Sequence, residues 1–139
     1  MGIKFGAVSR CDNFARNSKI IHTTNAPAAI GPYSQVVFSP YGKTLYVSGC
    51  IGIFPAGQFV GPTVEEQARH ALQNLVAIVM PPAAPRKNTD LLTQNMDLYT
   101  SVNKIYEEFF DEAKPARAAF AVAALPAGAL NEIECVACL

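Results

Sequence analysis

The C-terminal stretch of the chain is mostly small and apolar, and it reads PARAAFAVAALPAGALNEIECVACL over residues 115–139. This pattern predicts two strands, 116–125 and 131–138, joined by the turn sequence PAGAL. Three charged side chains interrupt the apolar pattern, those of Arg117, Glu132 and Glu134. A buried ion without a partner costs several kcal/mol, which is comparable with the net stability of a small domain. The fold must therefore pair these charges with one another or present them to a charged ligand.

Hydrophobic periodicity predicts the remaining elements. Short β-branched or alternating segments at 20–24, 33–39 and 43–53 are typical of strands. Two helices are predicted at about 63–79 and 97–112, the first behind a capping box in the sequence Thr-Val-Glu-Glu. Residues 80–96 are ambiguous, because three prolines open the segment and Asp90 weakens the strand-like run KNTDLLT. The order β-β-β-α-(β)-α-β-β predicts an α+β sandwich.

Composition limits the classes of protein that fit. The chain has 139 residues, of which 50% are hydrophobic and 16% charged, enough apolar material for one core and a subunit interface. The formal net charge of zero argues against a nucleic-acid partner. No apolar run approaches the roughly 20 residues of a membrane span. We expect a single domain at 20–139, preceded by an extension at 1–19.

The predicted extension is basic but has no continuous apolar core of the kind that a secretory signal requires. A frayed or partly ordered extension of a cytoplasmic protein is the favoured interpretation, and a mitochondrial presequence is the alternative. The four cysteines are accordingly expected to be reduced. Cys135 and Cys138 form a C-x-x-C sequence, but residues three apart on a strand point to opposite faces. Small buried thiols are therefore favoured over a metal or redox site.

Arg117 is the first candidate for a functional side chain. Its planar fork of donors matches a carboxylate bound by two hydrogen bonds. The alternative is an internal ion pair with Glu132 or Glu134, and sequence spacing does not decide between them. Those two glutamates lie on one face of the last strand, and a carboxyl group in an apolar pocket can transfer a proton near neutral pH.

Two more candidates come from the N-terminal half. Gly31-Pro32 predicts a turn that delivers Tyr33 to a site, although an ordinary aromatic at the start of a strand is the alternative. Ser48 could offer its hydroxyl to a ligand beside Gly49, or it could be a satisfied core serine. His70 falls outside the apolar stripe of the first helix and is expected to be solvated. No nucleotide-binding or serine-hydrolase motif occurs, so a cofactor and covalent serine catalysis have no support.

Five motifs together resemble one family over about residues 20–139. They are NAPAAIGPYSQ, LYVSG-x-I, EEQARHALQNL, SVNKIYEEFF and PARAAFAVAALPAGALNEIE, and in this order they resemble the RidA family, also called YjgF or reactive intermediate deaminase. The resemblance implies a chorismate-mutase-like α+β sandwich, with a mixed sheet and two helices on one face. It also implies a homotrimer with ligand pockets in the clefts between subunits.

The same resemblance implies a chemistry. Members hydrolyse enamine and imine intermediates, such as 2-aminoacrylate and 2-iminopropanoate, to 2-oxo acids and ammonia, without a metal or an organic cofactor. Arg117 in the P-A-R motif would bind the substrate carboxylate, and Glu132 would activate water and help protonate the departing ammonia. Glu134 would be structural. The other substrate-binding positions implied are Tyr33, Ser48, Asn103 and the backbone of Ala119.

The chain departs from the family pattern at three places. Cys50 stands where glutamine usually follows Ser-Gly, and Ala118-Ala119 follow Arg117 where bacterial members usually have Ser-Cys. The 80–96 segment is richer in proline and shorter than usual. A remodelled 80–96 segment could alter substrate choice, weaken the trimer or abolish activity. Two alternatives therefore remain beside the deaminase, namely a non-catalytic trimer that binds a small carboxylate, and a ribonuclease or translation inhibitor. The neutral charge of the chain argues against the last of these.

Overall fold

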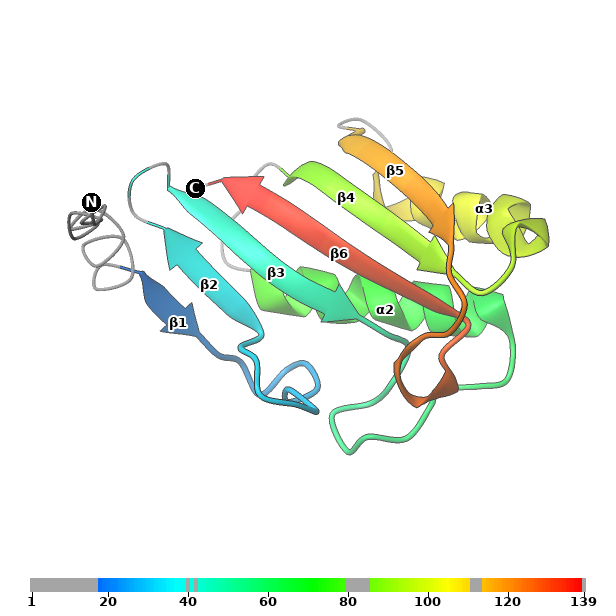
Figure 1. Ribbon diagram of the computed structural model, residues 1–139, viewed down its shortest axis with the longest axis horizontal. Coiled ribbons are helices and arrows are strands. Elements are labelled where there is room, and N and C mark those ends of the chain that lie inside the picture. The colour runs from blue at the N-terminus through cyan, green and yellow to red at the C-terminus, as the bar shows by residue number, and fades with distance from the viewer. Residues whose placement is uncertain (1–17, 40, 42, 80–85, 111–113, 139) are drawn as a thin grey trace, which may run out of the picture.

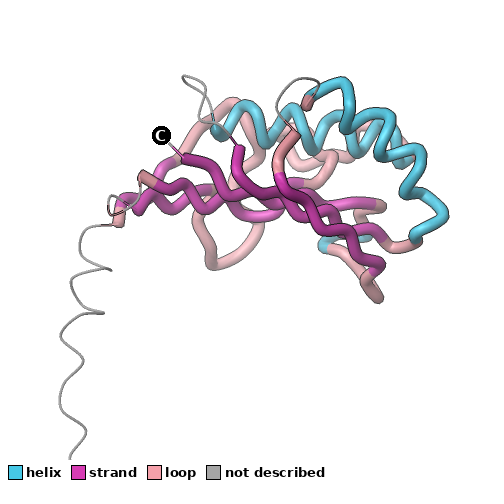
Figure 2. The backbone as a smooth tube through the Cα atoms, turned by 90° about the horizontal axis from the view of Figure 1, so that it is seen from above, coloured by secondary structure: helices cyan, strands magenta, loops and turns pink. Residues whose placement is uncertain are grey.

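One mixed sheet carries two helices on one of its faces (Figures 1 and 2). The computed structural model describes residues 18–39, 41, 43–79, 86–110 and 114–138. In this part of the chain the strands are β1 (Lys19–Ile21), β2 (Val36–Ser39), β3 (Thr44–Cys50), β4 (Arg86–Thr93), β5 (Ala116–Ala121) and β6 (Asn131–Cys138). The helices are α2 (Val64–Val79) and α3 (Tyr99–Phe109), and short 3₁₀ turns η1 and η2 span Met96–Leu98 and Pro126–Gly128.

The sheet order is β1-β2-β3-β6-β4-β5, and every pair is antiparallel except β4 with β5, which is parallel. This arrangement confirms the predicted α+β class, the mixed sheet and the two helices on one face. We call the face of the sheet that packs on α2 and α3 the helix face, and the opposite one the open face (Figure 2). The predicted extension at 1–19 falls largely outside the described residues.

The ambiguous 80–96 segment contains a complete strand, β4, which lies between β6 and β5. Asp90 does not interrupt it, because alternation along the strand buries Thr89 and Leu91 and turns Asp90 to the open face. The Asp90 carboxylate also accepts a hydrogen bond from the backbone N–H of Ala118 at 3.4 Å. The sequence prediction undervalued this strand because it counted Asp90 as unfavourable in a strand, whereas Asp90 occupies a half-exposed position on the open face.

Several predicted boundaries were too wide. The strand predicted at 33–39 begins only at Val36, and the Gln35 side chain just before it bonds the preceding loop at Thr23 and Pro27. The strands predicted at 43–53 and 116–125 end at Cys50 and Ala121, and the helix predicted at 97–112 is η1 followed by α3.

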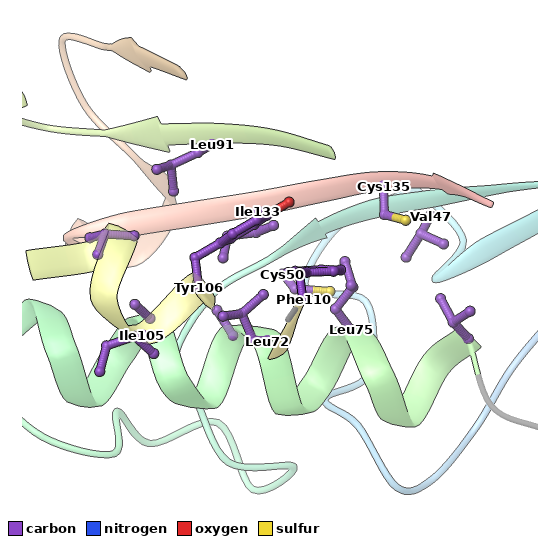
Figure 3. Close-up of a cluster of buried hydrophobic side chains, with 14 of the residues drawn as sticks. Val47, Cys50, Leu72, Leu75, Leu91, Ile105, Tyr106, Phe110, Ile133 and Cys135 are labelled. Carbon is purple, nitrogen blue, oxygen red and sulfur yellow. The ribbon is translucent and has the colours of Figure 1, made fainter. Parts of the chain in front are cut away.

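The first helix begins as predicted. Thr63 Oγ1 accepts from the Glu66 N–H at 3.3 Å, and Glu66 Oε2 accepts from the Thr63 N–H at 3.1 Å, so the capping box is confirmed. From this start, apolar side chains on one side of α2 point toward the sheet. Figure 3 shows Leu72 and Leu75 of α2 and Ile105 of α3 beneath Leu91 and Ile133 of the central strands.

Two polar side chains of α2, Gln67 and Asn74, are buried, and His70 is partly buried. Asn74 is buried, and its side-chain amide donates to the carbonyls of Ile51 at 3.1 Å and Ile53 at 2.9 Å, tying the loop after β3 to the helix. The prediction that His70 is solvated holds only in part, because the residue is partly buried. Its ring stands edge-on to Phe54 with 4.9 Å between centroids, and its Nε2 is buried without a hydrogen-bond partner among the described residues.

We expect Asn74→Ala to lower the free energy of unfolding by about 2 kcal/mol, because it removes two buried hydrogen bonds and leaves the Ile53 carbonyl without its side-chain donor. Urea unfolding at a fixed chain concentration measures this. The matched control is Gln73→Ala, which truncates the exposed neighbour on the same helix and should change stability by less than about 0.5 kcal/mol. Equal losses in the two variants would contradict the assigned role of Asn74.

Candidate functional site

Arg117 projects from β5 toward the helix face. It stands beside Thr89 of β4 in the parallel register, and Thr89 is 1% exposed beneath the helices. The Arg117 Nη2 donates to the Tyr99 hydroxyl at 2.7 Å and to Asn103 Oδ1 at 2.8 Å, both on α3. The guanidinium also lies over the Tyr106 ring at 4.6 Å from its centroid. Hydrogen bonds and an aromatic face thus hold this half-buried cation in place.

The structure brings together Asn103 and Arg117, two residues for which the family resemblance implied a substrate-binding role. Both line a cleft of about 310 Å³ at the end of α3. The sequence analysis named neither Tyr99 nor Tyr106 as a partner of Arg117. The missed signal is the helical spacing of Tyr99, Asn103 and Tyr106, which places all three on one side of α3.

The alternative of an internal ion pair for Arg117 is wrong. Across the described residues, the only ion pair is Arg69 with Glu108, between α2 and α3. Neither Glu132 nor Glu134 reaches Arg117, because both project to the other face of the sheet. The guanidinium is instead held by neutral acceptors, so its charge is left for a ligand.

Glu132 lies on the open face, across from Leu92 of β4, while its neighbours Asn131 and Ile133 are fully buried on the helix face. Its carboxylate lies over Gly49 of β3, where a Cβ atom would stand 1.7 Å from Oε1. Only glycine at this position leaves room for the carboxylate. Burial raises the Glu132 pKa above its ordinary value, and the nearby negative charge of Glu134 adds to the effect.

A β-bulge in β3 between Val47 and Cys50 shapes the neighbouring pocket. The pocket is lined by Tyr33, Ser48 and Gly49, together with loop residues 27–30 and side chains of α2. Ser48 Oγ donates to the Ser34 carbonyl at 2.7 Å, and the Tyr33 hydroxyl accepts from the Ile30 N–H at 3.2 Å. Tyr33 precedes β2 in a loop and is 47% exposed, and Ser48 is only partly buried. The predicted pair thus lies in one pocket, and Gly49 connects that pocket to Glu132.

Cys50, the departure from the family pattern, is buried beside this pocket. Burial is the main reason that its pKa rises to about 12, with smaller contributions from Cys135 and Glu132. Its thiol stays protonated at neutral pH and donates to the Ser48 carbonyl at 3.6 Å, so it is no nucleophile there. Cys135 faces the helices and Cys138 the other side, as the alternation along β6 predicted.

Ala119 lies on β5, which is an edge strand of the sheet, and packs its methyl group against the core. Only its backbone is therefore available to a ligand. In the part of the chain that the structure describes, no group of three or more His, Cys, Asp or Glu side chains could hold a metal ion. In those same segments, no helix has the length and apolar character needed to cross a membrane.

The candidate residues therefore form two half-sites on one chain. The first consists of Arg117, Asn103 and the backbone of Ala119, and it lies on the helix face beside β5. The second consists of Glu132, Tyr33 and Ser48, grouped around Gly49. The first can bind an anion, and the second carries a carboxyl group able to accept and return a proton.

Comparison with known proteins gives one consistent result. Residues 23–139 match the family model described as Endoribonuclease L-PSP. A mouse protein named 2-iminobutanoate/2-iminopropanoate deaminase is 46% identical over 86% of this chain and 90% of its own length. The human protein of the same name is 43% identical over 86% and 88%. A plant relative is the chloroplastic Reactive Intermediate Deaminase A of Arabidopsis thaliana, at 36% identity over 87% of this chain and 66% of the relative.

Solved structures agree with the sequence matches. RidA from an Antarctic Psychrobacter superimposes with a TM-score of 0.81 at 31% identity, covering 87% of this chain and 99% of that one. Escherichia coli TdcF, solved with bound serine, gives a TM-score of 0.79 at 34% identity, covering 87% and 98%. The fold, the ordered motifs and these relatives lead to one conclusion: the chain belongs to the RidA/YjgF/L-PSP family of reactive intermediate deaminases.

Proposed function

We propose that this protein hydrolyses reactive 2-imino acids, and their enamine tautomers, to 2-oxo acids and ammonia. The observation that carries the proposal is Arg117, a half-buried cation held by neutral acceptors with no carboxylate partner among the described residues. Relatives at 43–46% identity are named for the deamination of 2-iminobutanoate and 2-iminopropanoate, and these substrates carry the carboxylate that such an arginine binds.

The proposed reaction needs little from the protein beyond positioning and proton transfer. Arg117 binds the substrate carboxylate, and the Tyr33 pocket encloses the rest of the molecule. Glu132 takes a proton from water as the water oxygen attacks C2 and the C=N electrons move to nitrogen. The same carboxyl group then returns the proton to nitrogen. Glu132 then takes the hydroxyl proton of the resulting carbinolamine and passes it to nitrogen, so that the C–N bond breaks as the C=O bond forms and ammonia leaves.

The positions of the two half-sites support an active site shared between copies of the chain. Arg117 faces the helices while Glu132 lies on the open face, so one copy does not direct both toward one small substrate. The open face also exposes large apolar side chains, Tyr46 at 50% and Phe120 at 53%, which a second copy would cover. We therefore propose a homotrimer with the reaction in the clefts between subunits. We also propose that this protein is located in the cytoplasm.

A ribonuclease is the second candidate, because the matching family model is described as an endoribonuclease. The chain has equal numbers of basic and acidic residues, 11 of each, so it lacks the charge excess that binds a phosphate backbone. RNA affinity that falls steeply with added salt would favour this candidate. The absence of such binding, together with imine turnover, would favour the deaminase.

We expect the native chain to consume 2-aminoacrylate that a serine dehydratase generates in the same vessel. Surviving imine is trapped with semicarbazide and measured. Arg117→Ala should lower kcat/KM about 100-fold, because a charge-assisted contact to the carboxylate is lost. Arg117→Lys should fall between the two, because it keeps the charge without the planar fork.

The control for this experiment is Arg69→Ala, which removes a surface arginine whose ion pair lies on the helices, and it should retain native turnover. Circular dichroism establishes that each variant is folded. If the folded native chain leaves the trapped fraction unchanged, the deaminase proposal is wrong for this substrate. Binding of pyruvate, followed by NMR, would then identify the non-catalytic carboxylate-binding alternative.

Mixing two weakly active variants tests the shared site. Arg117→Ala and Glu132→Gln should each have strongly reduced activity alone, whereas co-refolding them should restore activity. In random assembly, about a quarter of the interfaces combine an intact arginine with an intact glutamate from the neighbouring copy. The recovered rate is measured in the trapping assay. No recovery from a mixture that forms mixed trimers would place both residues in one copy's site.

Gly49→Ala should leave the fold intact and lower kcat about 100-fold. Its new methyl group would displace the flexible end of Glu132, and misplacement of a catalytic group by about 1 Å costs a factor of this size. Steady-state kinetics and a thermal melt measure the two effects. In a Glu132→Gln background, Gly49→Ala should cause no further loss of kcat. A further loss of kcat there would contradict the explanation.

A further inference from the structure

Two acidic residues on the open face have no role in the proposed reaction. Asp90 of β4 and Glu134 of β6 are direct cross-strand partners. Both line a hollow on the open face with Tyr46, Asn88 and Val136. Like charges directly opposite each other on a sheet are destabilising, so this pair is a cost to the fold.

Only a small part of that cost is offset locally. Asp90 Oδ1 accepts from the Ala118 N–H at 3.4 Å and from the Asn88 side-chain amide at 3.5 Å. Glu134 is exposed, and no basic side chain forms an ion pair with either carboxylate in the described part of the chain. A pair of this kind needs a reason beyond stability.

The neighbour that both carboxylates share is Glu132. Glu134 follows it on the same face of β6, about 7 Å along the strand. Asp90 lies diagonally across on β4 at a similar distance. The adjoining strands add no described charge to this surface, because β3 contributes Tyr46 and Gly49 there and β5 contributes Ala118 and Phe120. Every described charge that faces Glu132 is therefore negative.

We propose that Glu134, reinforced by Asp90, is a positioning residue whose negative charge makes Glu132 a stronger proton acceptor near neutral pH. This inference rests on the proposed function, in which Glu132 takes a proton from water and returns it to nitrogen. An ordinary surface carboxylate is a weak base at neutral pH and holds a proton poorly. Burial on Gly49 strengthens Glu132 as a base, and the negative charge of Glu134 strengthens it further. Asp90 places a second charge of the same sign diagonally across on β4.

The direct test is a ¹³C NMR titration of the Glu132 side-chain carboxyl in the full chain, with its signal assigned by its loss in Glu132→Gln. Glu134→Gln should lower the Glu132 pKa by about half a pH unit, the shift expected for one charge about 7 Å away in a largely aqueous field. Asp90→Asn should lower it by less, because the Asp90 carboxylate is partly satisfied by hydrogen bonds.

The charge-matched control is Glu65→Gln on α2, which removes one negative charge on the other side of the sheet and should leave the Glu132 titration unchanged. An unchanged or raised Glu132 pKa in Glu134→Gln overturns the inference. If that variant fails to fold, a Glu132 pKa in Asp90→Asn that does not fall below the native value overturns it as well.

A kinetic measurement separates this inference from the proposed function. In the trapping assay, the acid limb of the kcat/KM profile should move to lower pH in Glu134→Gln by the amount seen in the titration, an effect that mere loss of stability would not produce. A native chain without turnover overturns the proposed function, but the titration still tests whether Glu134 raises the Glu132 pKa. Turnover with an unshifted titration overturns the inference alone.

Discussion

The register between β6 and β4 is the constraint on which the rest of the structure depends. It pairs Leu92 with Glu132 and Thr89 with Cys135, which fixes the carboxylate on the open face and the apolar neighbours against the helices. The parallel register of β4 with β5 then turns Arg117 to the helix face beside Thr89. A slip of one residue would exchange the two faces, burying Glu132 in the core and losing the contacts of Arg117 with α3. Core packing and site geometry are thus fixed by the same pairing.

The chain keeps a half-buried arginine without an acidic partner by surrounding it with neutral groups. Tyr99 and Asn103 accept both hydrogen bonds from Nη2, and the Tyr106 ring supplies a π face. These contacts offset part of the desolvation cost and keep the positive charge uncompensated. An internal carboxylate would have given a more stable resting state and a weaker anchor for a substrate. Glu132 is likewise a partly buried group without an opposite charge beside it in the described part of the chain. It loses solvation over Gly49 and faces further negative charge from Glu134.

Sequence patterns predicted what depends on local periodicity. The capping box and apolar spacing of α2 and the alternation along β6 followed from short-range rules, whereas Asn103 and Ala119 became candidates only through the family resemblance. The strand β4 was undervalued, since Asp90 looks unfavourable until its open-face position is known. Short-range rules could not show that Arg117 and Glu132 lie on opposite faces of the sheet. Their strands, β5 and β6, do not pair with each other, because β4 from an earlier part of the chain lies between them. Tyr99 was missed for a similar reason, since its importance comes from a contact between α3 and β5.

The division of the site between two faces gives the open face a double role. Its apolar side chains, such as Tyr46 and Phe120, favour contact with another copy, whereas its carboxylates oppose close approach of one more negative group. A positively charged group that enters this surface is favoured, and in the proposed assembly that group is Arg117 of a neighbouring copy, arriving with its bound substrate. Assembly and catalysis would then use the same electrostatic preference. A weakened interface would lower activity even where every side chain of the two half-sites is intact.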